Sequence, residues 1–282
     1  MNADKMDVYG GKKIMKLRIP VALTVAGSDS GGGAGIQADL RTFAFHCVHG
    51  TSAVTCVTAQ NTLGVMRVDA LSAEAVKAQI EAVVEDIGVD AVKTGMLLNR
   101  EIMAAVASGV EALNIRNLVV DPVMVSRSGD RLIDDGAIAF LQDVLIPMAA
   151  VVTPNRFEAQ ILSGLEIASL DDMRSAAEKI HSLGAKAVLV KGGGMKGDLR
   201  GIDVWFDGTR LDVLKTENVD TLNTHGTGCT LSAAISANLA LGKDLFTAVT
   251  LAKNYVTTAL KYALDIGEGQ GPVGHFFPLL LK

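Results

Sequence analysis

The chain is poor in the features that mark secreted, membrane-spanning and nucleic-acid-binding proteins. It holds three cysteines in 282 residues, and none of their spacings is typical of a zinc site or a disulfide framework. An odd number of cysteines without a disulfide framework indicates reduced thiols in a cytosol. No apolar stretch approaches the roughly 18 residues of a spanning helix, and no basic run accompanies the net charge of −5. The sequence therefore predicts a cytoplasmic protein whose partner is a small molecule, not a membrane or a nucleic acid.

The N-terminal segment also lacks the pattern of a secretory signal. Several basic residues stand in residues 1–18, and no continuous apolar segment follows them before Pro20. We therefore expect residues 1–18 to form a flexible tail. Residues 19–282 show no linker, composition break or internal repeat, and 49% of the whole chain is hydrophobic. This composition predicts one domain with a large core, which buries roughly three quarters of the unfolded surface.

Short apolar runs alternate with helical patterns along this domain. The expected strands are Val21–Gly27, Ser52–Ala59, Ala91–Met96, Leu118–Met124, Ala149–Thr153 and Ala187–Lys191. Between them lie amphipathic helices, such as one with Val76, Ile80, Val83, Val84 and Ile87 on a single face. Strands separated by helices imply right-handed crossovers and a mainly parallel sheet. Because the strands are almost uniformly apolar, we expect helices on both faces of that sheet.

Other local signals mark helix ends and one hairpin. Ser169 to Asp172 is a variant of the capping box and predicts the start of a helix. Asp207-Gly208 separates Asp203–Phe206 from Arg210–Leu214, a spacing typical of a two-residue hairpin. We expect this hairpin to form an antiparallel edge of the sheet. Two further helices are expected at Thr230–Leu241 and Leu245–Leu264.

Polar or glycine-rich segments follow all six predicted strands. They are Gly27–Gly35, Thr58–Asn61, Lys93–Met96, Asp121–Met124, Thr153–Glu158 and Lys191–Gly194. Ligands of open α/β sheets bind beyond the carboxyl ends of the strands, where these segments lie. A purely structural scaffold does not require so many polar or glycine-rich segments at one edge of its sheet, so the pattern predicts an active site there.

The Gly27–Gly35 segment is a candidate substrate loop. Gly33 to Ala38 matches the G-x-G-x-x-A form of a dinucleotide-binding turn, but no acidic residue ends the second strand to bind a ribose. No Lys-Ser or Lys-Thr follows the glycines either, which argues against a Walker loop. We interpret the loop as wrapping a small substrate, with Asp39 on the next helix facing it. The alternative is a tight structural turn.

The strongest single motif is Thr224-His-Gly-Thr-Gly-Cys229, which precedes a helix rich in small residues. A glycine turn at a helix start directs unpaired N–H groups and the helix dipole at one place, which favours an anion. Such donors stabilise the charge of a transferring phosphoryl group. Cys229 stands where the dipole is expected to lower a thiol pKa toward roughly 3.5–7.5, so that it could act as a base. The alternative is a buried, inert cysteine.

Charged residues at neighbouring strand ends complete the candidate site. Asp121 and Glu158 are carboxylates of the kind that hold Mg²⁺ beside a phosphate. Lys191 can neutralise phosphate charge, and His225 adjoins the anion site as a secondary contact. Each of these residues taken alone could instead be a helix cap or a surface charge.

Taken together and in order, these motifs closely resemble the hydroxymethylpyrimidine/phosphomethylpyrimidine kinase family of thiamine biosynthesis, within the ribokinase-like superfamily. The resemblance runs from about Val21 to Phe276. It implies a three-layer α/β/α fold and a homodimer. It also implies two successive phosphoryl transfers from ATP with Mg²⁺, first to the hydroxymethylpyrimidine and then to its monophosphate.

The resemblance also implies a role for individual residues. Gln60 would hydrogen-bond the aminopyrimidine, and the substrate pocket would be lined by Gly27, Asp39, Met96 and Val123. The nucleotide phosphates and magnesium would be served by Lys191, Asp121, Asn155, Glu158 and His225. The anion hole would be formed by Gly226, Thr227 and Gly228, with Cys229 as the base.

Two departures and two alternatives accompany this interpretation. Sugar kinases of the superfamily have Asp where Cys229 stands, which argues against a sugar substrate. The family usually has His where this chain has Gly194, which bears on the nucleotide contacts. A pyridoxal kinase of the same superfamily is one alternative, because pyridoxal also carries a hydroxymethyl group on a planar nitrogen ring. A non-catalytic pyrimidine-binding regulator is the other.

Overall fold

The computed structural model describes residues 6–9, 12–15, 18–125 and 132–281. A nine-stranded sheet forms the centre, in the order β11-β10-β9-β8-β7-β6-β3-β4-β5. Its parallel strands are β3 (Val21–Asp29), β4 (His49–Gln60), β6 (Ala91–Thr94), β7 (Leu118–Val120), β8 (Val151–Val152) and β9 (Val188–Val190). All six lie where the sequence predicts them. Most are shorter than expected, because the polar residues at their carboxyl ends leave the sheet.

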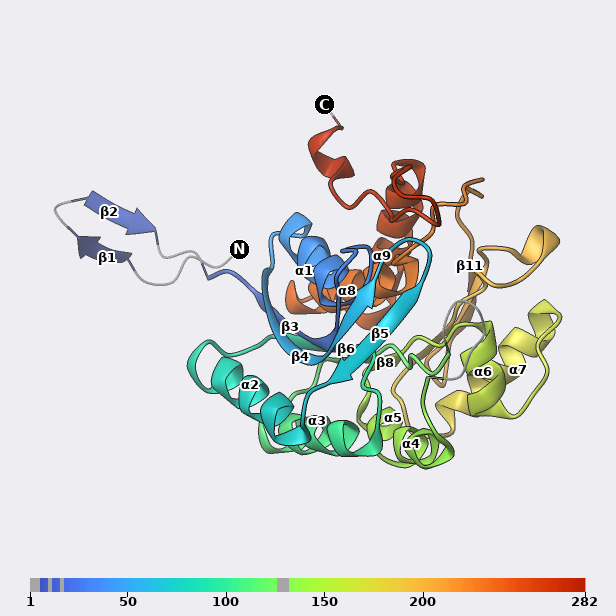
Figure 1. Ribbon diagram of the computed structural model, residues 1–282, viewed down its shortest axis with the longest axis horizontal. Helices are drawn as coiled ribbons and strands as arrows, with labels where there is room; N and C mark the ends of the chain where they lie inside the picture. Colours follow the sequence, from blue (N-terminus) through green and yellow to red (C-terminus); the bar gives the residue numbers. More distant parts are fainter. Residues whose placement is uncertain (1–5, 10–11, 16–17, 126–131, 282) are drawn as a thin grey trace.

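Helices cover both faces of the sheet, which confirms the three-layer prediction (Figure 1). One layer contains α2 (Ala73–Asp86), α3 (Arg100–Ala112), α4 (Asp135–Phe140), α5 (Ile146–Met148), α6 (Arg156–Ser163) and α7 (Leu170–His181), with the π-helical turn Leu141–Leu145 between α4 and α5. The opposite layer contains α1 (Gly35–Phe45), α8 (Thr227–Ala240) and α9 (Leu245–Lys261).

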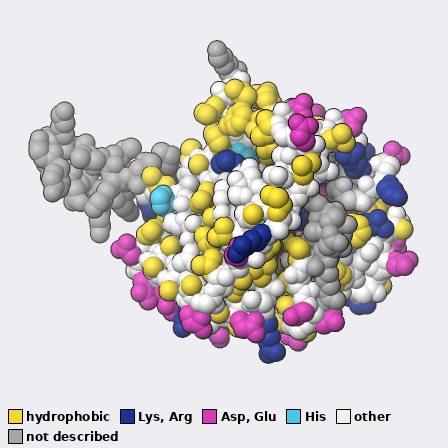
Figure 2. All heavy atoms as spheres, in the orientation of Figure 1, with side chains coloured by type: hydrophobic (Ala, Val, Ile, Leu, Met, Phe, Trp, Pro, Cys, Tyr) yellow, Lys and Arg dark blue, Asp and Glu magenta, His cyan; other side chains and the backbone are white. Residues whose placement is uncertain are grey.

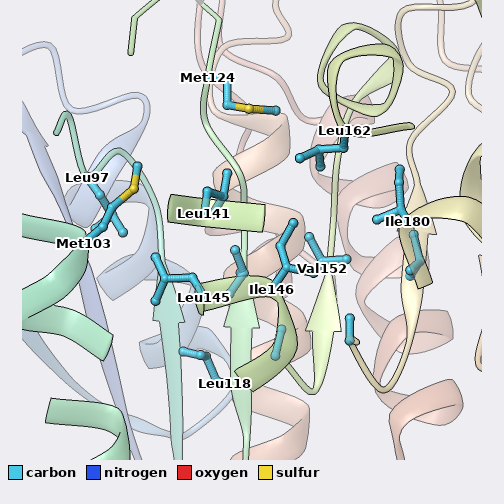
Figure 3. Close-up of a cluster of buried hydrophobic side chains, with 14 of the residues drawn as sticks. Leu97, Met103, Leu118, Met124, Leu141, Leu145, Ile146, Val152, Leu162 and Ile180 are labelled. Atoms are coloured by element: carbon cyan, nitrogen blue, oxygen red, sulfur yellow. The ribbon is translucent and has the colours of Figure 1, made fainter. Parts of the chain in front are cut away.

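Alternate residues of each central strand enter the two cores. Leu118 and Val152 belong to the cluster under α2–α7, where they lie close to Leu145 and Ile146 in Figure 3. Val119, from the same strand as Leu118, belongs instead to the cluster under α8 and α9. This alternation of fully buried residues explains why the strands read as continuous apolar runs.

The helix predictions are confirmed with two corrections. The Ser169–Asp172 capping box is present at the start of α7. In α2, Val76 and Ile80 are buried as expected, but Ile87 is the C-cap and is 48% exposed, because the helix ends before it. The helix expected from Thr230 begins three residues earlier, at Thr227.

The two edges of the sheet are both antiparallel. The predicted hairpin is present as β10 (Asp203–Phe206) and β11 (Leu211–Leu214) at one edge. The other edge is β5 (Val65–Ala70), which pairs with β4 and which the sequence analysis missed. Every residue of β5 is exposed, so no buried face leaves a hydrophobic signature in the sequence.

The N-terminal segment 1–18 contains two further strands, β1 (Met6–Tyr9) and β2 (Lys12–Met15), which form a separate two-stranded sheet. Its flexibility stays a prediction. Among the residues that the structure describes, no helix is long and apolar enough to cross a membrane.

The strand order reverses around β3, whose neighbours are β4 on one side and β6 on the other. Ligands of open α/β sheets bind at such a reversal, beyond the carboxyl ends of the strands. The register of β3 against β4 shifts between Ala26 and Ser28, where β4 advances from Val54 to Val57, so β4 bulges opposite Gly27. Bulges of this kind are common beside active sites, where they redirect the chain.

Candidate active site

The start of α8 lies beside charged groups from two other strand ends. Gly226 is the N-cap of this helix, with a φ of 81°, and no side chain caps the first turn. A Cβ atom on Gly228 would stand 3.4 Å from Lys191 Nζ and 3.9 Å from Asp121 Oδ2. The Thr227 N–H donates to the Thr224 carbonyl at 3.3 Å. Because the first N–H groups of a helix have no partner within it, those that follow Thr227 in the first turn are available to an anion beside Lys191.

The glycine loop after β3 packs directly on this turn. A Cβ on Gly226 would overlap the Gly33 carbonyl oxygen, and a Cβ on Gly33 would overlap the His225 ring. At positive φ and in such close contact, only glycine fits at Gly226. The loop thus brings the start of α1 to the start of α8, and the Gly35 backbone lies close enough to the Cys229 thiol to act on its pKa.

The expected direction of the Cys229 pKa is wrong. Desolvation raises the pKa of the Cys229 thiol above its usual range, although the residue is partly exposed. The charge of Lys93 and the Gly35 N–H act in the opposite direction, and Asp39 and Asp121 add to the rise. The helix-end position therefore does not by itself make Cys229 a thiolate.

Asp39 forms a buried ion pair with Lys93 beneath the site. Lys93 Nζ lies 2.8 Å from Asp39 Oδ2, and both side chains are fully buried. The Thr24 hydroxyl donates to the same oxygen at 2.6 Å. Asp39 Oδ1 has no hydrogen-bond partner within the described part of the chain. Burial raises the pKa of Asp39, although the attraction of Lys93 opposes that rise.

A polar cluster of Asp29, Gln60 and His225 lies at the carboxyl ends of β3 and β4. His225 Nε2 is 2.9 Å from Asp29 Oδ2 and 3.5 Å from Gln60 Nε2. Asp29 also accepts the N–H groups of Gly31, Gly33 and Ala34, so it holds the glycine loop in place. Although burial disfavours its charge, the bonds to His225 and to this backbone lower the pKa of Asp29. His225 thus lies beside the predicted substrate residue Gln60.

The other predicted substrate residues lie near the carboxyl ends of β3, β6 and β7. A Cβ on Gly27 would stand 2.7 Å from Cys56 Sγ and 3.0 Å from Met96 Cε, so glycine admits the close approach of these side chains. Met96 is half-buried, and its carbonyl accepts the Thr55 hydroxyl at 2.7 Å. Val123 is half-buried beyond β7.

Asp121 is the centre of a second polar cluster, at the carboxyl end of β7. Lys191 Nζ donates to its Oδ1 at 2.9 Å, and the Ser232 hydroxyl donates to its Oδ2 at 3.1 Å. The Thr153 hydroxyl donates to Oδ1 at 3.3 Å. Burial opposes the charge of Asp121, but Lys191 and Lys93 outweigh this and lower its pKa. Asp121 is therefore a carboxylate, and the Lys191 side chain beside it retains 13% exposure.

Asn155 and Glu158 form the capping box of α6. The Asn155 side chain accepts the N–H groups of Phe157 and Glu158, and the Asn155 N–H donates to Glu158 Oε2 at 2.8 Å. Burial raises the pKa of Glu158 to about 7, against the attraction of Lys191 and with the repulsion of Asp121. The helix cap that the sequence analysis weighed as an alternative is thus present, beside the Asp121 cluster.

Three residues of these clusters were not predicted to take part in the site. Asp29 is the last residue of β3 and belongs to the Gly27–Gly35 segment, Lys93 lies in β6 at the start of the Lys93–Met96 segment, and Ser232 lies one turn into α8. The first two belong to motifs that the sequence analysis singled out. Their partners lie 196 and 54 residues away along the chain, so no local pattern indicates the pairs.

Comparison with known proteins agrees with this geometry. A family model described as phosphomethylpyrimidine kinase matches residues 29–274. The hydroxymethylpyrimidine/phosphomethylpyrimidine kinase of Synechococcus elongatus is 59% identical over 263 residues, which is 93% of this chain and 100% of that protein.

Two solved structures are similar as well. An ADP complex of Bacillus subtilis pyridoxal kinase has a TM-score of 0.88 and 41% identity, covering 94% of this chain and 100% of that one. A phosphomethylpyrimidine kinase from Clostridium difficile has a TM-score of 0.76 and 44% identity, covering 86% of this chain and 99% of that one. The ribokinase-like fold and the resemblance drawn from the motifs are confirmed, and the chain belongs to the phosphomethylpyrimidine kinase family.

Proposed function

We propose that this protein transfers phosphate from ATP to 4-amino-5-hydroxymethyl-2-methylpyrimidine and then to the resulting monophosphate, giving the pyrophosphate used in thiamine biosynthesis. The observation that carries the proposal is the close approach of the start of α1 to the start of α8. Cys229 lies there between the glycine loop of the predicted substrate side and the Lys191–Asp121 pair of the predicted phosphate side.

On the phosphate side, the backbone of Gly226, Thr227 and Gly228 would bind the transferring phosphoryl group as an anion hole. Lys191 would neutralise phosphate charge, since its ammonium lies beside Gly228. Charge spreads over the equatorial oxygens in the transition state, so fixed donors of this kind lower the barrier.

Asp121 and Glu158 fit the way in which proteins hold Mg²⁺ beside a nucleotide. Within the described ranges, no group of three or more His, Cys, Asp or Glu residues could hold a metal ion. Mg²⁺ usually binds through one or two carboxylates together with phosphate oxygens and water, so this donor pair suffices once a nucleotide is present. When bound, Mg²⁺ would neutralise charge on the phosphates.

On the substrate side, the Gln60 amide would bind the ring nitrogen and amine of the pyrimidine, because it offers both a donor and an acceptor. The position of His225 beside Gln60 favours a substrate contact over the nucleotide contact first expected. Asp39 would lie beneath the substrate pocket, where its side chain is fully buried against Lys93. Cys229 would take the proton of the hydroxymethyl group, and Lys93 and Gly35 favour the thiolate that this requires.

The test is a mass measurement of the products formed from the pyrimidine alcohol and MgATP. We expect one added phosphoryl group at early times and two at late times. Binding of the pyrimidine without any product would favour the non-catalytic regulator and overturn the proposal.

A second candidate function, phosphorylation of pyridoxal or pyridoxine, is favoured by one comparison. The pyridoxal kinase of Bacillus subtilis is 41% identical to this chain and shares its fold. Rates with the pyrimidine and with pyridoxal, measured at equal MgATP, separate a main activity from a side activity.

We further infer a cytoplasmic homodimer. Apolar side chains gather over the face of the molecule where β5 lies (Figure 2), and Leu63 and Met66 are 71% and 72% exposed. Exposed strand edges of this kind pair with other chains. Light scattering should give twice the monomer mass, and Met66→Asp should shift it toward the monomer.

A further inference from the structure

A buried ion pair outside the predicted site links β10 to α9. Lys253 Nζ lies 2.7 Å from Asp203 Oδ2, and the two side chains are 9% and 7% exposed. Asp203 is the first residue of β10, and Lys253 lies on the face of α9 that packs on the sheet. Neither Asp203 nor Lys253 belongs to the predicted substrate, phosphate or magnesium residues.

The pair holds both ends of the loop that joins β9 to β10. Asp203 Oδ1 accepts the Gly192 N–H at 2.9 Å, and Lys253 Nζ donates to the Gly201 carbonyl at 2.7 Å. The two ends are also bonded to each other, because the Gly201 N–H donates to the Gly192 carbonyl at 3.0 Å. A Cβ on Gly192 would overlap the Ile202 carbonyl oxygen, so the ends touch. The pair thus closes the base of the loop.

The base of this loop adjoins the predicted phosphate side. Gly192 follows Lys191, whose ammonium lies beside Gly228 at the start of α8 and 2.9 Å from Asp121. Met195 packs into the core under α2–α7 and is 5% exposed, whereas a Cβ on Gly193 or Gly197 would meet nothing within 4 Å. A shift of the Gly192 backbone would therefore move Lys191 as well as the exposed glycines of the loop.

Stability alone is a poor reason for such a pair. Taking two charges out of water is costly, and well-packed apolar residues often stabilise a core as much or more. A buried pair with further hydrogen bonds can instead fix one backbone arrangement. Here those further bonds go to the two ends of one loop, Gly192 and Gly201.

We propose that Asp203 and Lys253 are positioning residues for the nucleotide: through Gly192 and Gly201 they set the place of Lys191 and of the loop 192–202. This inference rests on the proposed ATP-dependent function. The two residues act through the backbone and do not touch either substrate.

The test compares Lys253→Met with wild type in steady-state kinetics, varying MgATP and the pyrimidine separately. We expect KM for MgATP to rise about tenfold, the factor that corresponds to one charge-assisted hydrogen bond, and KM for the pyrimidine to stay within about twofold. Hydrogen exchange at the Gly192 and Gly201 amides should become faster without nucleotide. The double variant Asp203→Asn/Lys253→Met leaves no unpaired buried charge, and it carries the test if Lys253→Met does not fold.

Val249→Ala is the matched control, because Val249 lies one turn earlier on α9, is fully buried and belongs to the core under α8 and α9. It should lower stability without changing KM for MgATP. An unchanged KM for MgATP in the Lys253 and double variants, or an equal rise for both substrates, would overturn the inference. Failure of the wild-type protein to make any product would instead overturn the proposed function.

Discussion

Two Lys–Asp pairs flank Cys229, and they differ mainly in their access to solvent. Lys93 and Asp39 are 2.8 Å apart, with no exposed surface on either side chain. Lys191 and Asp121 are 2.9 Å apart, but 13% of the Lys191 side chain is exposed beside the start of α8. Identical chemistry thus occurs in a sealed and in an open setting.

This difference separates what each pair can do. A sealed ammonium cannot reach a phosphate, so Lys93 acts on its surroundings through its field, which favours the Cys229 thiolate. An open ammonium is free to contact a ligand while Asp121 keeps its charge in place. The two lysines therefore differ in role because of where they lie in the fold: Lys93 acts through its electrostatic field, and Lys191 can bind a ligand.

The largest expected effect lies between the two pairs, at Cys229. Cys229→Ala should lower kcat by about 10²–10⁴-fold, the usual contribution of a positioned base, and leave substrate affinity nearly intact. Cys229→Asp should recover part of the loss. A thiol-directed alkylator should inactivate the enzyme, with protection by bound pyrimidine. Near wild-type kcat in Cys229→Ala for both transfers would show that another group takes the proton.

The next effect distinguishes the sealed pair from the open one. Lys93→Met should lower the free energy of unfolding by about 3–5 kcal/mol, because it leaves Asp39 as an uncompensated buried charge. Lys191→Met should destabilise less and weaken MgATP binding more. Urea unfolding and nucleotide titration of both variants test this order, and equal losses of stability would contradict the comparison.

A pH effect should come from the open side. The pKa of Glu158 is raised from 4.5 to about 7 by burial, so its carboxyl binds more protons in the folded state. Its contribution to stability is therefore full below about pH 4.5 and lost as the pH rises through about 7. The loss should be on the order of 3 kcal/mol without nucleotide. Glu158→Gln, measured by urea unfolding at several pH values, should remove this part of the slope; an unchanged slope would assign it elsewhere.

The smallest effect is expected on the substrate side, at Gln60. Gln60→Leu should weaken pyrimidine binding by about 1–3 kcal/mol, because buried ring polar groups lose their partner. MgATP binding should change little, since Gln60 lies at the end of β4, by His225. Calorimetric titration with each ligand measures both values, and equal losses would place Gln60 outside the substrate pocket.

Much of the fold was predictable because its signals are local. Apolar runs predicted the six parallel strands, Asp207-Gly208 predicted the hairpin, and Ser169 with Asp172 predicted a helix start. β5 was missed because its exposed residues have no buried partner whose periodicity could reveal them. The start of α8 at Thr227 follows from backbone contacts between Gly226 and Gly33, which are distant in sequence.

The sequence by itself determined the protein family and the fold class, since its motifs mark the strands along the chain and the polar residues at their carboxyl ends. Only the tertiary structure decided which of these polar residues are buried, which are accessible, and in which direction their pKa values shift. It buried the Lys93–Asp39 pair, left Lys191 accessible, and raised the pKa of Cys229 where the helix end alone predicted a lower one. The physical reason is that burial and electrostatic fields depend on what surrounds a group in space, and those neighbours come from strands far apart along the chain.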